Sequence, residues 1–203
     1  MSATNTSAKS LQWVRKCVAF RSATACRAKG ISRAASVATV ARAAGIPYAW
    51  SPSTDKAAHF DFLIERLAAV KPDLVVLARY MQVLTPKVIG RYPFRIINIH
   101  PSLLPYHPGS NAYKQAWQEG VRVSGCTAHF VTEQLDAGPV ILQDVFHIRV
   151  GEDTLEEVKA RGQALEGKVL SQAVQLFLND QLVVKDKKVI FRPGRFAGAA
   201  EST

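Results

Sequence analysis

The sequence predicts an α/β fold with a doubly wound, mostly parallel sheet and helices on both of its faces. Two short runs rich in branched apolar residues, "DLVVLARYM" and "RIINIH", predict buried parallel strands. Thr85-Pro86 opens a brief helix between them, and alternation of strand and helix is typical of this class. The 203 residues and the 48% hydrophobic content suit one compact domain with a substantial core.

The other elements follow from periodicity and from capping residues. A short helix ends at Gly45, and a strand is expected to begin directly after it. Asp55 or a neighbouring Ser or Thr caps the next helix, which ends at Lys71-Pro72. Beyond a proline-rich loop, "NAYKQAWQEG" predicts a helix, and "VSGCTAHFV" and "PVILQDVFHI" predict two strands around the turn "LDAGP".

The C-terminal part predicts a long helix and a hairpin. Thr154 and Glu157 form a capping box at the start of the helix. The apolar residues expected on one face of it are Leu155, Val158, Leu165, Val169, Val174 and Phe177. "LVVKDKKVIF" predicts a closing hairpin around a Lys-Asp-Lys turn.

The N-terminal strand of such a sheet is missing or degenerate in the sequence pattern. That strand is typically central, so its absence would leave a gap between its neighbours. Part of "LQWVRKCVAF" has the apolar, β-prone content to fill the gap. The alternative is a truncated product that folds poorly or only with a partner.

The positive charge of the chain is concentrated near its N-terminus. Eight cations precede the first acidic residue, Asp55, and without them the net charge falls from +10 to +2. Residues 1–34 are basic, free of acids and rich in Ser, Ala and Thr, the composition of an organellar transit peptide. A misassigned start or a damaged gene end is the alternative. A nucleic-acid-binding arm is disfavoured because no aromatic residues alternate with the charges, so no nucleic-acid partner is expected.

The cysteines and the hydropathy indicate a soluble intracellular protein. Cys17, Cys26 and Cys126 are odd in number and widely spaced, which argues against a disulfide framework and a zinc ribbon. No apolar run is long enough for a transmembrane helix, so no membrane partner is expected. The location is a mitochondrion or plastid if residues 1–34 are a transit peptide, and otherwise the cytoplasm. A homo-oligomer is compatible with the sequence.

The candidate catalytic residues follow the strand "RIINIH". Asn98 and His100 are two residues apart on it, so their side chains share a face at its carboxyl end, where α/β sheets bind ligands. An amide donor beside a proton carrier suits acyl chemistry, because the amide stabilises an oxyanion while the imidazole moves a proton. A structural histidine bonded to a nearby carbonyl would give the same pattern.

Asp136 and His129 are weaker candidates. Asp136 lies in the turn "LDAGP", where it either caps the turn or orients the His100 imidazolium and a water molecule. His129 could bind a metal with His100 and His107, but no ligand spacing supports this, and no metal is expected.

Taken together, "INIHPSLLP", "LDAGPVILQ" and "LARYMQVL" resemble the formyltransferase-fold family that handles the formyl group of 10-formyltetrahydrofolate. The resemblance runs from about residue 35 to residue 191 and implies a catalytic domain over 35–192. The Gly- and Ala-rich composition after Pro193 predicts a flexible tail over 193–203. It implies that Asn98, His100 and Asp136 are catalytic, and that folate is a substrate with no permanently bound cofactor. The residues that it implies for folate binding are Tyr80, Met81, Gln82, Val83, Leu84, Thr132, Glu133, Gln134 and Leu135.

Two branches of the family compete. "LARYMQVL" and the C-terminal "EGKVLSQAVQLFLNDQLVVKDKKVIF" look more like formyltetrahydrofolate deformylases, which pass the formyl group to water. Pro101 looks more like glycinamide ribonucleotide formyltransferases, which use an amine acceptor, but the Gly-Ser-Asn phosphate loop of that branch is not found. The expected activity is therefore hydrolysis to formate and tetrahydrofolate. Formyl transfer to glycinamide ribonucleotide is the alternative, and a non-catalytic folate-binding remnant is a hypothesis of another class.

Overall fold

The computed structural model describes residues 17–20, 38–51 and 54–192. The chain divides into two compact units, Met1–Leu84 and Thr85–Thr203. Among the helices of the described ranges, none combines the length and the apolar character that crossing a bilayer requires. The possible transit peptide at 1–34 lies mostly outside these ranges, and the predicted tail at 193–203 lies wholly outside them.

The first unit contains a parallel pair of strands. Strand β1 (Cys17–Phe20) pairs with β2 (Leu74–Leu77) in parallel, with Cys17 opposite Leu74. All four residues of β2 are buried, as expected for a strand covered on both faces. β1 consists of the last four residues of "LQWVRKCVAF", so the segment with β-prone content does supply a strand before β2.

Helix α3 (Lys56–Val70) lies between these strands in the chain. Its N-cap is Asp55, whose Oδ1 atom accepts a hydrogen bond from the backbone N of Ala58 at 3.1 Å. Lys71 ends the helix in the left-handed conformation, directly before Pro72. Both boundaries agree with the sequence prediction. The strand expected after Gly45 is not formed, and residues 46–51 are irregular instead.

The second unit is built on three antiparallel strands. Strand β3 (Ile96–His100), which follows the short helix α4 (Pro86–Ile89), pairs with β4 (Val123–Phe130). β4 pairs in turn with β5 (Val140–His147). The α/β fold class is confirmed, with antiparallel pairing in this unit and parallel pairing between β1 and β2. The connection from Phe130 to Val140 is too short for the crossover that parallel neighbours need, so β4 and β5 are antiparallel.

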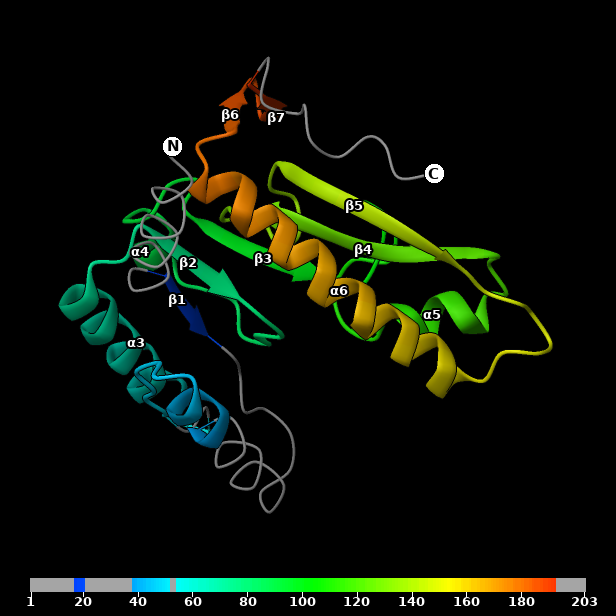
Figure 1. The fold of residues 1–203 in the computed structure, drawn as a ribbon, viewed down its shortest axis with the longest axis horizontal. Helices are drawn as coiled ribbons and strands as arrows, with labels where there is room; N and C mark the ends of the chain where they lie inside the picture. The colour runs from blue at the N-terminus through cyan, green and yellow to red at the C-terminus, as the bar shows by residue number, and fades with distance from the viewer. Residues whose placement is uncertain (1–16, 21–37, 52–53, 193–203) are drawn as a thin grey trace, which may run out of the picture. The chain divides into compact units, whose positions relative to one another are not determined.

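Helix α6 (Leu155–Leu178) crosses one face of these three strands (Figure 1). The predicted capping box is present, with Glu157 N donating to Thr154 Oγ1 at 3.3 Å and Thr154 N donating to Glu157 Oε2 at 2.8 Å. Of the six apolar positions predicted to face the core, Val158 and Val169 are fully buried. The other four are half-buried, and the rest of the buried stripe is Gly162, Glu166 and Ala173.

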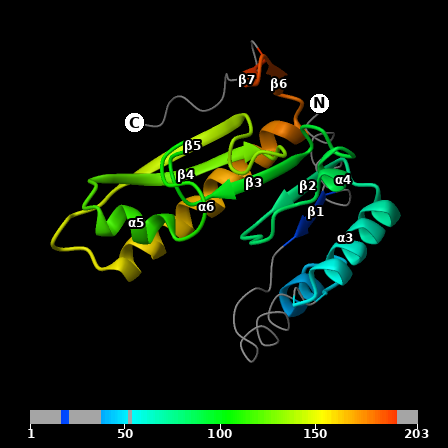
Figure 2. The same ribbon diagram turned by 180° about the vertical axis from the view of Figure 1, so that it is seen from behind.

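Phe130 at the end of β4 meets Phe177 of α6 edge to face, with ring centroids 6.2 Å apart. Its β3 partner Ile97 therefore also faces α6. Asn98, His100 and their β4 partners point to the opposite face, because side chains alternate along a strand. That opposite face is turned toward the viewer in Figure 2.

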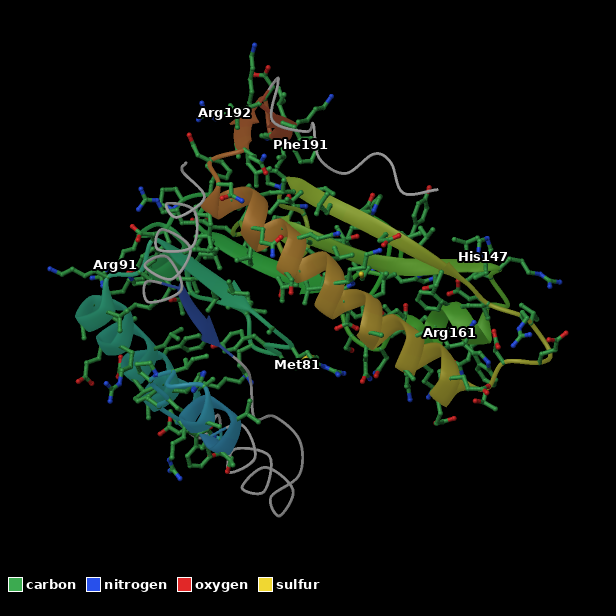
Figure 3. All side chains as sticks on the ribbon, viewed as in Figure 1. Met81, Arg91, His147, Arg161, Phe191 and Arg192 are labelled. Carbon is green, nitrogen blue, oxygen red and sulfur yellow. The ribbon has the colours of Figure 1, made fainter. Side chains whose placement is uncertain are left out.

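Helix α6 also forms an ion pair and a hydrogen bond with the end of β5 and the loop that follows it. Arg161, labelled in Figure 3, pairs with the buried carboxylate of Asp153, and its Nη1 atom donates to the backbone O of His147 at 3.0 Å. The Arg161 hydrogen bond, followed by that of the Arg149 backbone N at 2.6 Å, holds the pKa of Asp153 below its usual value. Trp117 of α5 (Ala112–Gln118) donates to the backbone O of Asp153, so three elements meet there.

The hairpin predicted at the C-terminal end is confirmed. Strands β6 (Leu182–Lys185) and β7 (Lys188–Phe191) pair in antiparallel fashion. Asp186 and Lys187 between them have φ angles of +50° and +60°, the signature of a two-residue type I′ turn.

Candidate active site

The imidazole of His100 is held between two acceptors. Its Nε2 atom lies 3.0 Å from the backbone O of His107, and its Nδ1 atom lies 3.4 Å from Oδ2 of Asp136. A carbonyl oxygen only accepts, so Nε2 carries a hydrogen. Nδ1 faces the carboxylate of Asp136, which can accept a hydrogen bond only from a protonated Nδ1. A proton taken up at Nδ1 would be stabilised at once by Asp136.

The carboxylate of Asp136 is positioned by its own turn. Asp136 has a φ of +50°, a left-handed conformation that aspartate tolerates better than most residues. Its Oδ2 atom accepts a hydrogen bond from the backbone N of Gly109 at 3.1 Å. The turn is closed where Phe130 N donates to Pro139 O at 2.9 Å, and a side chain at Gly138 would overlap the backbone O of Phe130. The aspartate thus links its turn to the loop after β3.

That loop, residues 101–110, is fixed to β4 through Thr127. The Thr127 hydroxyl donates to Ser102 O at 2.7 Å and accepts from Leu104 N at 3.0 Å and from Gln143 Nε2 at 2.9 Å. The hydroxyl is fully buried, and both its donor and its acceptor capacity are used. The loop therefore has a defined path from His100 to the His107 carbonyl that holds the imidazole.

Asn98 lies two residues before His100 and on the same face of β3. Its Nδ2 atom lies 3.2 Å from Nε2 of His129, its directly opposite neighbour on β4. The same Nε2 atom is 3.9 Å from Oδ1 of Asp136. The structure thus brings Asn98, His100 and Asp136 into one cluster, with His129 between the amide and the carboxylate.

The sequence suggests only a metal-ligand role for His129. Its Nδ1 atom contacts the backbone O of Phe130 at 3.0 Å, and the His107 side chain pairs with Glu119 at 2.7 Å. Across the described ranges, no three His, Cys, Asp or Glu side chains gather in a way that could hold a metal ion. The sequence signal for His129 is its place opposite Asn98 in an antiparallel pair, which only the register reveals.

The two segments expected to bind folate are described separately, since they belong to different units. In the first, the buried Tyr80 hydroxyl contacts Nε2 of His59 at 3.0 Å, and burial raises the pKa of Tyr80 to about 12. Leu84 is buried, whereas Met81 and Val83 expose about 60% of their surface. In the second, Thr132 donates to Gln134 O at 3.2 Å, and Leu135 is exposed. Both segments present apolar side chains to solvent.

An α/β fold that gathers an amide, an imidazole and a carboxylate on one face of a sheet has the parts of an acyl-transfer enzyme. The formyl transferase family model matches residues 3–174. The chain belongs to the formyl transferase family.

Relatives of known name fall in both branches. The chain is 44% identical over 127 residues to the formyltetrahydrofolate deformylase of Bacillus subtilis (strain 168), a match that covers 63% of this chain and 42% of the relative. The crystal structure of a deformylase from Pseudomonas syringae pv. tomato str. DC3000 superposes with a TM-score of 0.77 at 33% identity, over 87% of this chain and 65% of that one. Glycinamide ribonucleotide transformylase 1 from Symbiobacterium toebii gives 0.72 at 37% identity, over 86% and 79%. The match spans less than half of the Bacillus protein.

Proposed function

We propose that this chain hydrolyses 10-formyltetrahydrofolate to formate and tetrahydrofolate. The observation that carries the proposal is the approach of the Nδ1 atom of His100 to the carboxylate of Asp136, at 3.4 Å. A water molecule bound to that carboxylate would lie within reach of Nδ1, which can take its proton. The similarity to deformylases in sequence and fold supports water as the acceptor.

The reaction forms a carbon–oxygen bond, breaks a carbon–nitrogen bond and moves a proton from water to the departing nitrogen. The water oxygen attacks the formyl carbon while His100 Nδ1 takes up a proton and Asp136 stabilises the resulting imidazolium. Asn98 donates to the formyl oxygen as that atom gains negative charge. The carbon–nitrogen bond then breaks, and His100 returns its proton to the departing nitrogen of tetrahydrofolate. Formate leaves as the second product.

Folate binding is assigned to the two segments with exposed apolar side chains. In the first unit, backbone groups of Tyr80, Met81, Gln82, Val83 and Leu84 are assigned to the pterin ring. In the second unit, backbone groups of Thr132, Glu133, Gln134 and Leu135 are assigned to folate binding as well. The exposure of Met81, Val83 and Leu135 supports this assignment, because flat apolar ligands bind against such side chains.

Formyl transfer to glycinamide ribonucleotide is the second candidate. It is favoured by Pro101 directly after His100 and by the similarity to the Symbiobacterium transformylase. The same three residues would serve either acceptor, so the cluster does not discriminate between them.

One assay of the purified protein distinguishes these activities. It measures formate and tetrahydrofolate released from 10-formyltetrahydrofolate, with and without glycinamide ribonucleotide. Formate released without the amine supports the deformylase. A formylated ribonucleotide, with no formate in its absence, would assign the transferase instead. Tight folate binding without turnover under either condition would identify a non-catalytic folate-binding protein.

A further inference from the structure

We propose that His129 is a positioning residue that sets the direction of the Asn98 amide, so that one amide hydrogen is presented to the formyl oxygen. The proposal rests on the proposed function, since it assigns Asn98 a task in that reaction. It gives a role to a buried histidine that the mechanism otherwise leaves unused.

The first step of the argument is the pairing of the two residues. Asn98 and His129 are directly opposite each other in the antiparallel β3–β4 pair, so their side chains leave the sheet on the same face. The Nδ2 and Nε2 atoms are 3.2 Å apart, within hydrogen-bond distance. Only 2% of the surface of His129 is exposed, so water cannot readily replace this contact.

The second step is the tautomer of His129. Its Nδ1 atom lies 3.0 Å from the backbone O of Phe130, which can only accept, so Nδ1 carries the hydrogen. In the neutral ring, Nε2 therefore presents a lone pair to Asn98. The Asn98 amide therefore donates a hydrogen bond from its NH₂ group to Nε2, because turning its oxygen toward Nε2 would bring two acceptors together. One amide hydrogen is then bound to His129, and the second points away from the ring.

The third step is the charge state of the ring. A proton on Nε2 would repel the amide NH₂ and would attract Oδ1 of Asp136, which is 3.9 Å away. Both changes would disturb the cluster around His100. Burial lowers the pKa of His129, and this effect outweighs the nearby Phe130 carbonyl and Asp136, so the ring is neutral at neutral pH. The lone pair is thus available under working conditions.

The kinetic test is a double-mutant cycle. His129→Leu keeps the apolar bulk and removes the acceptor, and we expect kcat to fall by about tenfold to a hundredfold while KM for 10-formyltetrahydrofolate changes little. His129→Gln can place its side-chain oxygen near Asn98 and should recover part of that loss. In an Asn98→Ala background, His129→Leu should have no further effect on kcat. Equal losses in both backgrounds would overturn the proposal.

A matched control separates positioning from general damage. Cys126 is fully buried on β4, but its side chain points to the opposite face from His129. We expect Cys126→Ala to lower thermal stability, with an effect on kcat that is the same with and without Asn98. Non-additivity shared by Cys126→Ala would mean that the cycle reports on packing, and the assignment of His129 would fail.

A nitrogen NMR measurement tests the inference whether or not the protein has the proposed activity. Spectra of the wild type at neutral pH should show His129 with a protonated Nδ1 and a bare Nε2, and His129→Leu should shift the Asn98 side-chain amide signals. A proton on Nε2, or unchanged amide signals, would overturn the inference. Failure of formate release with the expected NMR result would instead count against the proposed function alone.

Discussion

The Nδ1 atom of His100 and the Oδ2 atom of Asp136 lie 3.4 Å apart, although 35 residues of chain lie between the two residues. Both side chains are more than nine-tenths buried. The partners that fix them are backbone groups, the carbonyl of His107 for the imidazole and the N–H of Gly109 for the carboxylate. One loop thus orients both members of the pair, which suits preorganisation for proton transfer.

The first prediction concerns the three proposed catalytic side chains. Asn98→Ala, His100→Ala and Asp136→Asn should each lower kcat for formate release by about two orders of magnitude or more, because each removes a group that acts on the transition state. Binding of folate should be nearly intact, as measured by fluorescence titration or calorimetry. His147→Ala, at an exposed position on β5, is the control and should behave as the wild type. Normal turnover in any of the three variants would remove that residue from the mechanism.

The second prediction concerns the hydroxyl of Thr127. Thr127→Val keeps the shape of the side chain but leaves Leu104 N and Ser102 O without their partner, which should cost about 1–3 kcal/mol in the free energy of unfolding. Thr127→Ser retains the hydroxyl and should cost less. Urea unfolding of both variants measures the difference. Equal stability of the Val variant and the wild type would show that the network does not stabilise the fold.

Local signals in the sequence were sufficient for most elements. The helix caps Asp55 and Thr154 and the strand β2 depend only on residues close to them in the sequence. They could therefore be predicted without knowing the fold. The strand predicted after Gly45 does not form, because the aromatic content of residues 46–51 favours a strand only where a neighbouring strand is available for packing. Antiparallel pairing of β4 and β5 likewise depends on the geometry of the turn between them.

The candidate site could be predicted only in part. Asn98 and His100 share a strand, and their common face follows from alternation alone. The approach of His129 to Asn98 depends on the β3–β4 register. A shift of one residue in that register would turn the His129 side chain to the other face of the sheet. The buried face of α6 includes Gly162, where a side chain would overlap the ring of Tyr113. Hydrophobic periodicity does not predict this steric requirement.

The third prediction compares two glycines of α6. A methyl group at Gly162 would overlap the buried ring of Tyr113, so Gly162→Ala should lower the free energy of unfolding by about 1–3 kcal/mol. At the exposed Gly167 nothing lies within 4 Å, and Gly167→Ala should raise stability by about 0.5–1 kcal/mol through helix propensity. Thermal and urea unfolding measure both. In a Tyr113→Ala background the penalty at Gly162 should vanish, and a penalty that persists there would contradict the proposed clash.

The fourth prediction is a pH dependence of stability that originates at His129. Burial lowers the pKa of this residue in the folded protein below its ordinary value of 6.5. As the pH falls below 6.5, the unfolded chain therefore takes up a proton before the folded one does. The contribution of His129 is fully present above that pH and is lost as the pH falls toward the lowered folded pKa.

His129→Gln removes the titrating ring, so its free energy of unfolding should depend less on pH than that of the wild type in this window. Urea unfolding of both proteins between about pH 7.5 and about pH 5.5 measures the difference. Burial also lowers the pKa of His59, but His59 is present in both proteins, so its contribution cancels. The stability of the wild type relative to the variant should decrease steadily as the solution is acidified. A constant difference across the window would mean that His129 does not titrate differently in the folded and unfolded states.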